Sequence, residues 1–88
     1  MPRITFALAT MLSFMAFTPM AAQDYQKGYD AYQAGDYATA LQEFRPLAME
    51  GNAKAQWKVG FMYETGNGVP QDYAEAVKWM RLAAVQGH

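Results

Sequence analysis

Apolar side chains recur at helical spacing in four stretches of the chain, and polar or glycine-containing segments separate these stretches. Residues three or four positions apart lie on one face of an α-helix, so each stretch predicts a helix that buries one side. Gly35 and Gly51 follow the first two stretches, where glycine is typical of a helix end. The four predicted helices span residues 24–34, 37–50, 53–64 and 73–86.

The second predicted helix has an apolar stripe on one side, and Gln42, Glu43 and Arg45 are expected to face away from it. Pro46 lies inside this helix. A proline there removes one backbone hydrogen bond and costs roughly 3 kcal/mol in an exposed setting, so we expect a kink near residues 42–45 or a shortened helix. The stripe consists of Tyr37, Ala40, Leu41, Phe44, Leu47 and Ala48.

The last two predicted helices differ in how their apolar residues are distributed. The third is apolar on more than one side, which indicates a helix between two neighbours, and Gly60 at its middle indicates a close approach of two backbones. In the fourth helix, Trp79 and Leu82 lie outside the main stripe, and we expect them to have no partner within the chain. That stripe consists of Tyr73, Ala76, Val77, Met80, Ala83 and Ala84.

A shift of 36 residues superimposes the segment after Gly35 on the segment after Gln71. An internal period of this length indicates stacked helical repeats, which favour a protein that presents a binding surface over an enzyme. The identical pairs are Asp36 and Asp72, Tyr37 and Tyr73, Ala38 and Ala74, Ala40 and Ala76, Arg45 and Arg81, Ala48 and Ala84, and Gly51 and Gly87.

The first 22 residues resemble a secretory signal peptide, with Arg3 near the start, an apolar stretch over residues 4–17, and Pro19 before a small-residue segment. The apolar stretch is shorter than the 18 or so residues that a spanning helix needs. We expect cleavage after Ala22, and the alternative is an uncleaved anchor. Cleavage would give a periplasmic or secreted protein without stable membrane insertion. The predicted units are a signal peptide at 1–22, a first helix pair at 23–51 and a second at 52–87.

The charge and composition of the chain exclude several classes of function. Loss of Arg3 with the signal peptide leaves six of the seven Lys and Arg residues against eight Asp and Glu, a net charge of −2. The signs alternate along the chain, which is not typical of a nucleic-acid partner or of a membrane-surface helix. The sequence has no cysteine, so it offers no thiol nucleophile, zinc–thiolate site or disulfide, and we expect no cofactor.

Residues 52–87 resemble a Sel1-like repeat, a relative of the tetratricopeptide repeats. The resemblance rests on the Val59-Gly60 pair followed by Tyr63, the Gly-x-Gly-Val loop and its Asp, and the Ala-Ala-x-x-Gly ending. It implies an all-α solenoid, here two stacked antiparallel helix pairs, that mediates protein interactions, in exported bacterial members often in the envelope or in signalling. The matching positions are Gly60, Tyr63, Gly66, Gly68, Val69, Asp72, Ala76, Ala83, Ala84 and Gly87.

The first unit departs from this pattern because it lacks the insert that forms residues 67–71 in the second. It resembles a plain tetratricopeptide-type pair or an N-terminal cap. One exported, cysteine-rich branch of the family is associated with binding or hydrolysing β-lactams, and this chain lacks the paired cysteines of that branch.

Candidate chemistry is sparse in this sequence. His88 is the only histidine and lies outside every predicted helix, so we do not expect a catalytic base there. Asp36 and Asp72 recur at helix starts, which favours caps over a catalytic carboxylate pair. The Gly66-Asn67-Gly68 segment lacks the Lys-Ser or Lys-Thr and the preceding strand of a phosphate-binding loop, so it predicts a turn.

Aromatic and aliphatic residues are the better candidates for function. Trp57 and Phe61, on the first helix of the second pair, and Trp79 and Leu82, on its second helix, are the predicted partner-binding residues, and the partner is expected to be a protein or peptide. The stripe of Tyr25, Tyr29 and Tyr32 favours packing more than binding. Three alternatives stay open: self-association through the last helix, an envelope enzyme acting on peptidoglycan or β-lactams, and the N-terminal fragment of a longer array.

Overall fold

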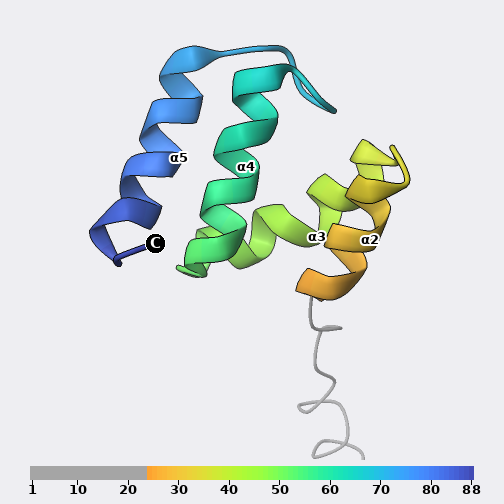
Figure 1. The fold of residues 1–88 in the computed structure, drawn as a ribbon, viewed down its shortest axis with the longest axis horizontal. Helices are drawn as coiled ribbons and strands as arrows, with labels where there is room; N and C mark the ends of the chain where they lie inside the picture. The colour runs from red at the N-terminus through yellow and green to blue at the C-terminus, as the bar shows by residue number, and fades with distance from the viewer. Residues whose placement is uncertain (1–23) are drawn as a thin grey trace, which may run out of the picture.

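A computed structural model describes residues 24–88, which form four α-helices. The helices pack in sequence order, so that α2 with α3 and α4 with α5 form two pairs and the α3–α4 contact joins them (Figure 1). This confirms the predicted all-α fold of two stacked helix pairs. The predicted signal peptide lies outside the described residues. The helices are α2 (Tyr25–Gln33), α3 (Tyr37–Met49), α4 (Ala53–Thr65) and α5 (Tyr73–Val85).

Each helix begins at a polar side chain that accepts hydrogen bonds from free backbone N–H groups of the first turn. Asp36 Oδ1 accepts one such bond at 3.2 Å, and Asp72 Oδ1 accepts two at 3.0 and 3.1 Å. Asp24 and Asn52 cap α2 and α4 in the same way. The two recurring aspartates therefore serve as helix caps.

The start of α5 forms only half of a capping box. Asp72 accepts from the N–H of Glu75, but the N–H of Asp72 itself donates to the carbonyl oxygen of Tyr63 at 2.9 Å. Glu75 instead pairs with Lys78, with 3.1 Å between Oε2 and Nζ. The bond from Asp72 to Tyr63 ties the start of α5 to α4, so it contributes to the packing of the pair.

Both repeats end in the same turn. Gly51 has φ 101° and donates its N–H to Ala48 O at 3.1 Å, and Gly87 has φ 86° and donates to Ala84 O at 2.8 Å. These conformations lie in the left-handed region, which glycine adopts without a Cβ clash. The backbone therefore repeats with the same 36-residue period as the sequence.

The loop after α4 reaches back over the first helix pair (Figure 1). A Cβ added at Gly68 would lie 2.8 Å from Cβ of Tyr37, the first residue of α3. Asn67 Nδ2 also donates to the Tyr32 hydroxyl at 3.4 Å. Gly66, at φ 75°, ends α4 and allows the chain to turn into this loop. The insert that the first unit lacks thus fastens the second pair to the first.

In each helix pair, the two helices cross at a glycine. A Cβ added at Gly60 would lie 2.8 Å from Met80 Cγ and 3.1 Å from the Ala76 carbonyl oxygen, so Gly60 marks the predicted crossing point of α4 and α5. A Cβ added at Gly28 would lie 2.8 Å from Phe44 Cε1, so α2 and α3 cross there. The sequence analysis missed Gly28, although Gly28 precedes Tyr29 as Gly60 precedes Phe61.

The core lies along α3 and α4 and consists of small residues around a few large ones. Phe44, Val59 and Met62 are its largest fully buried side chains. Helix α4 packs against both α3 and α5, which agrees with its apolar residues on more than one side. Of the helices between residues 24 and 88, none has the length and apolar character to cross a membrane. The core cluster is Ala40, Phe44, Ala48, Ala55, Val59 and Met62.

Glu43 does not face away from the first helix pair, so that prediction was wrong. Its side chain is buried, with Oε1 accepting from the Asp24 backbone N–H at 2.8 Å and Oε2 lying 3.6 Å from Lys27 Nζ. The carboxylate can be buried because a helix N-terminus and a lysine satisfy its charge. Its stem lies at the α2–α3 crossing, where its Cβ would be 3.1 Å from a Cβ at Gly28.

Pro46 does not shorten α3, which continues through it to Met49. The proline removes the one backbone hydrogen bond that an N–H at this position would donate to the Gln42 carbonyl, and α3 continues for three residues beyond it. Its side chain is half-buried. The shortened-helix alternative was therefore wrong.

Helix α5 is rotated relative to the predicted stripe. Ala76 and Ala83 are buried and Met80 is half-buried, as expected, but Tyr73 and Val77 are 64% and 48% exposed. Ala84 is exposed as well. The rotation follows from the crossing at Gly60, because Met80 and Ala76 must face α4 there. The apolar residues on the other side of the predicted stripe then point away from the described fold.

Candidate partner-binding surfaces

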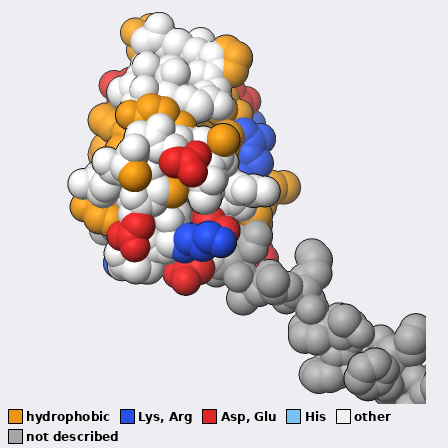
Figure 2. Space-filling model, turned by 90° about the vertical axis from the view of Figure 1, so that its right-hand side faces the viewer, with side chains coloured by type: hydrophobic (Ala, Val, Ile, Leu, Met, Phe, Trp, Pro, Cys, Tyr) orange, Lys and Arg blue, Asp and Glu red, His pale blue; other side chains and the backbone are white. Residues whose placement is uncertain are grey.

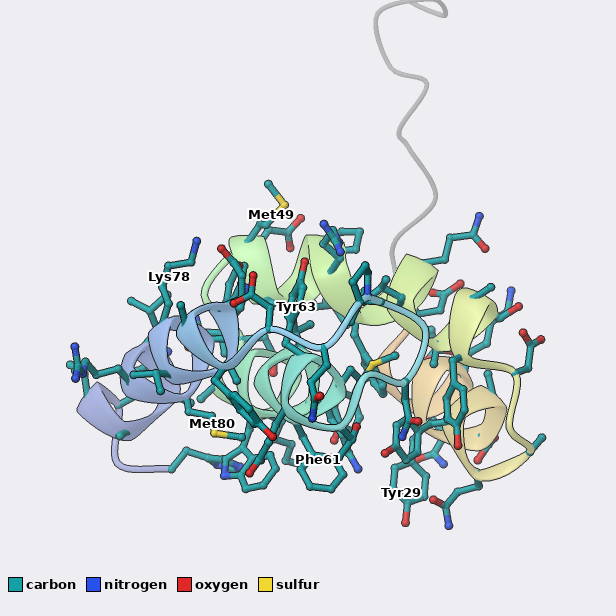
Figure 3. The ribbon with its side chains drawn as sticks, turned by 90° about the horizontal axis from the view of Figure 1, so that it is seen from above. Tyr29, Met49, Phe61, Tyr63, Lys78 and Met80 are labelled. Atoms are coloured by element: carbon teal, nitrogen blue, oxygen red, sulfur yellow. The ribbon has the colours of Figure 1, made fainter. Side chains whose placement is uncertain are left out.

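Trp57 and Phe61 lie one turn apart on α4 and stack with ring centroids 5.5 Å apart. The Trp57 side chain is 38% exposed, and Phe61 is half-buried. Figure 3 shows that Phe61 of α4 and Tyr29 of α2 project from the same side of the molecule. These aromatic side chains form one surface along the first helices of the two pairs, which we call the aromatic surface (Tyr29, Trp57, Phe61).

The other two tyrosines of α2, Tyr25 and Tyr32, pack against aromatic side chains of α3. Tyr25 packs against Phe44 with ring centroids 5.1 Å apart, and Tyr32 packs edge-on against Tyr37 at 5.2 Å. Burial, and then the neighbouring Tyr29, raise the pKa of Tyr25. Tyr25 and Tyr32 are both half-buried, whereas Tyr29 is 37% exposed. The packing expected for an aromatic stripe thus holds for two of its three members, and the third is presented to solvent.

Two lysines of α4 run beside this surface and face the tyrosines. Lys58 Nζ lies 4.7 Å from the Tyr32 ring centroid and 5.2 Å from that of Tyr29, and Lys54 Nζ lies 5.5 Å from that of Tyr25. Cations at these distances are attracted by the ring quadrupoles. The lysines therefore link the two pairs and give the aromatic surface a positive border.

His88 lies at a shallow hollow next to this border, lined also by Tyr25, Gln26, Tyr29 and Lys54. Its backbone N–H donates to Ala83 O at 3.2 Å, so the turn after α5 holds it there. Within residues 24–88, no cluster of three or more His, Cys, Asp or Glu side chains is placed to hold a metal ion. The hollow offers aromatic and basic contacts for a bound molecule.

Trp79 and Leu82 lie one turn apart on α5 but differ in their burial. Trp79 is half-buried and packs against the core cluster, so the expectation that it has no partner within the chain was wrong. Leu82 is 46% exposed and has the unpartnered position that was expected for it. Because Trp79 faces inward, Leu82 is the better placed of the two to contact another molecule.

Leu82 belongs to an apolar groove along α5, in which it is joined by side chains at helical spacing. Val77 is 48% and Val85 is 81% exposed, and the basic residues Lys78 and Arg81 lie among them. The sequence analysis missed this groove because it assigned Val77 to the buried stripe. The lining residues are Ala74, Val77, Lys78, Arg81, Leu82 and Val85.

A second groove on α3 is lined at five of the six corresponding positions after the 36-residue shift. Here Leu41 and Pro46 are half-buried, and Arg45 Nη2 donates to the Tyr63 hydroxyl of α4 at 3.2 Å. The repeat alignment, which pairs Arg45 with Arg81, was the signal that could have revealed both grooves. The α3 groove is lined by Ala38, Leu41, Gln42, Arg45 and Pro46.

Comparison with known proteins agrees with this geometry. A protein-family model described as Sel1 repeat matches residues 53–88, the segment that forms α4, the loop and α5. Residues 53–88 therefore form a Sel1 repeat. Proteins built from this repeat generally act as scaffolds for protein–protein interaction, and no catalytic family is evident.

Similar proteins occur in bacteria and in eukaryotes. The chain is 41% identical over 53 residues, 60% of its length, to an uncharacterized protein of Neisseria meningitidis. It is 35% identical over 63 residues, 72% of its length, to an exopolysaccharide production negative regulator of Rhizobium leguminosarum. It is also 36% identical over an 87-residue alignment, 85% of its length, to chitin synthase regulatory factor 3 of Schizosaccharomyces pombe.

The matches span only a small part of these relatives. They cover 11% of the Neisseria protein, 24% of the Rhizobium regulator and 9% of the Schizosaccharomyces factor. No solved structure matches the chain. The chain therefore spans less than a quarter of the length of each of these three relatives.

Proposed function

We propose that this protein is an exported, non-enzymatic scaffold that binds a protein or peptide of the bacterial envelope through the aromatic surface. The observation that carries this proposal is the set of exposed rings on the first helices of both pairs, Tyr29 at 37% and Trp57 at 38% exposed, beside Phe61. Rigid aromatic side chains supply large contact area at low conformational cost, which makes them frequent anchors at protein interfaces.

The surroundings of the rings favour a particular partner chemistry. Lys54 and Lys58 lie along the border of the aromatic surface, and His88 lies at the adjoining hollow. A peptide with an apolar or aromatic anchor and a nearby carboxylate would complement this arrangement, since a basic border steers acidic partners.

The names of two relatives support a role at the cell surface. One relative is named as a negative regulator of exopolysaccharide production and another as a regulatory factor of chitin synthase. From these names we propose that the partner belongs to the machinery that makes or regulates a surface polysaccharide. The signal-peptide pattern of residues 1–22 supports a location outside the cytoplasm.

The binding proposal can be tested with a displayed random-peptide library selected against purified residues 23–88. Selected peptides should share an apolar anchor and acidic residues, and Trp57→Ala should weaken their binding by at least tenfold, the usual loss when an interface anchor is truncated. Tyr73→Ala is the matched control, because Tyr73 is 64% exposed but lies on α5. Equal losses in both variants, or peptides insensitive to either, would contradict the proposal.

The export proposal has a separate test. Residues 1–22 fused to a phosphatase that is active only after export should give activity in bacterial cells, and replacing the apolar stretch with charged residues should abolish it. An inactive fusion would contradict the proposed location in the envelope, but it would not contradict the proposed binding surface.

A further inference from the structure

The loop between α4 and α5 contains an asparagine followed directly by a glycine, Asn67 and Gly68. Residues 67–69 form a bend that lies outside both helices, so their amides are not fixed by a helical hydrogen-bond pattern. Gly68 is exposed, and its N–H donates no hydrogen bond to an atom of residues 24–88. The backbone nitrogen of Gly68 is therefore accessible to solvent bases beside the Asn67 side chain.

An asparagine side chain reacts with the backbone nitrogen of the next residue where that nitrogen is accessible. Base removes the proton of the Gly68 nitrogen, which attacks Cγ of Asn67; the N–Cγ bond forms, the Cγ–Nδ2 bond breaks, and Nδ2 takes up a proton and leaves as ammonia. Water then opens the five-membered imide at either carbonyl carbon, which leaves aspartate or isoaspartate at this position. Water is the only co-reactant, and no electrons are transferred. Glycine hinders this attack least, because it has no Cβ and its backbone is the least restricted.

The fold holds the Asn67 side chain weakly. Its Nδ2 donates to the Tyr32 hydroxyl at 3.4 Å, which is long for an N–H···O bond, and no other described atom forms a hydrogen bond with this side chain. Asn52, the other asparagine of the chain, differs in both respects. Its Oδ1 accepts from the Ala55 N–H at 3.0 Å as the cap of α4, and the residue that follows it is Ala53, which has a Cβ. Asn52 is therefore a matched control for Asn67 within the same chain.

We propose that Asn67 deamidates spontaneously in the folded protein, and that its isoaspartate product loosens the loop from the first helix pair. Isoaspartate carries the main chain through the former side-chain carbon, so it adds one carbon to the backbone directly before Gly68. The backbone is close-packed at Gly68, since an added Cβ would lie 2.8 Å from Tyr37 Cβ and 3.3 Å from the Tyr37 carbonyl oxygen. The extra carbon must therefore displace the loop from the start of α3.

The aspartate product should be tolerated, because its backbone is unchanged. A carboxylate oxygen at position 67 can accept a hydrogen bond from the Tyr32 hydroxyl, and Lys58 Nζ lies 4.7 Å from the ring centroid of the same tyrosine. Residues 66–71 carry no charged side chain, and Figure 2 shows a mostly uncharged surface at the upper end of the molecule, where the loop lies in Figure 1. Either product therefore adds a negative charge to an uncharged segment.

The first test measures where deamidation occurs. Purified residues 23–88 are kept folded at mildly alkaline pH, which favours removal of the Gly68 amide proton, and the reaction is followed by peptide mass spectrometry. Asn67 should be converted to the carboxyl forms while Asn52 remains an amide. In the Asn67→Gln variant no converted protein should appear over the same time, because attack on the longer side chain requires a larger ring. An Asn67 that stays intact in the folded protein but reacts in urea would overturn the proposal.

The second test separates the added charge from the longer backbone. Aged protein is fractionated by anion exchange, and a protease that cuts before aspartate but not before isoaspartate identifies the two products. The isoaspartate form should unfold at a lower urea concentration than the Asn67→Asp variant, whose backbone is normal, and should show a shifted amide resonance of Tyr37. Circular dichroism establishes that the Asn67→Asp variant is folded. Equal unfolding midpoints of the two forms would overturn the loosening of the loop.

Discussion

Gly60 of α4 faces Met80 of α5 so closely that a Cβ on Gly60 would lie 2.8 Å from Met80 Cγ. The Ala76 carbonyl oxygen and the Met80 backbone nitrogen would lie at 3.1 and 3.3 Å from the same atom. The contact therefore involves backbone as well as side chain, so a Cβ at Gly60 would require α5 to shift by a few tenths of an ångström as well as Met80 to move. This crossing fixes which side of α5 is buried and which side forms the groove.

Gly60→Ala should destabilise the protein, although alanine favours a helix over glycine by about 1 kcal/mol. The added methyl group overpacks the crossing, which typically costs about 1–3 kcal/mol. Urea unfolding followed by circular dichroism measures the change. In the double variant Gly60→Ala, Met80→Ala, the smaller side chain at position 80 should reduce the cost of the added methyl group. A Gly60→Ala protein more stable than the unaltered protein would show that the helices do not meet as described.

Glu43→Ala should cost about 1–3 kcal/mol, because the substitution leaves the Asp24 N–H without its acceptor and Lys27 without its partner. Glu43→Gln should cost less, since the amide oxygen can still accept from the same N–H group. Glu50→Ala, on an exposed side chain of the C-cap residue of α3, is the control and should change the free energy of unfolding by no more than about 0.5 kcal/mol.

The stability of the protein should fall at alkaline pH through Tyr25. Burial raises the pKa of Tyr25 above the usual value of about 10 for a tyrosine, so the folded state holds the phenol proton more tightly than the unfolded state. This contribution is complete below the unfolded pKa and is lost as the pH rises through the raised folded pKa. Unfolding measured at about pH 9 and about pH 11 should show a smaller decrease for Tyr25→Phe than for the unaltered protein. Equal decreases would contradict the assignment.

Trp79→Ala and Leu82→Ala should differ in their effect on stability. Truncation of Trp79 removes packing against the core cluster and should cost about 1–3 kcal/mol, whereas truncation of the exposed Leu82 should change stability by no more than about 0.5 kcal/mol. Thermal unfolding of both variants measures the difference. The opposite order would contradict the inward position of Trp79 and the exposed position of Leu82.

Local patterns in the sequence predicted the parts of the fold that local physics determines. The caps at Asp36 and Asp72 and the turn that begins at Gly66 follow from hydrogen bonding and φ within a few residues. The crossing at Gly60 was predictable because glycine inside a helix is costly without a close neighbour. Each of these inferences needed only one residue type in one kind of position.

The rotation of α5 could not be predicted in this way. Its apolar residues cover most of the helix circumference, and the sequence analysis placed Val77 on the buried stripe and Trp79 outside it, the reverse of what the structure shows. The crossing geometry at Met80 decides between them. Glu43 escaped prediction because its burial depends on groups from α2, the Asp24 N–H and Lys27, which only the folded pair brings together.

The most direct test of the aromatic surface as the binding site follows the two tryptophan indole resonances, which report on separate helices. Residues 23–88 labelled with ¹⁵N are titrated with a peptide selected from the library. Trp57 is exposed on α4 and Trp79 packs against the core, so the account predicts that the Trp57 indole resonance shifts together with the amides of Tyr29 and Phe61, while that of Trp79 stays in place. Shifts confined to Trp79 and the α5 groove, with Trp57 unmoved, would contradict it.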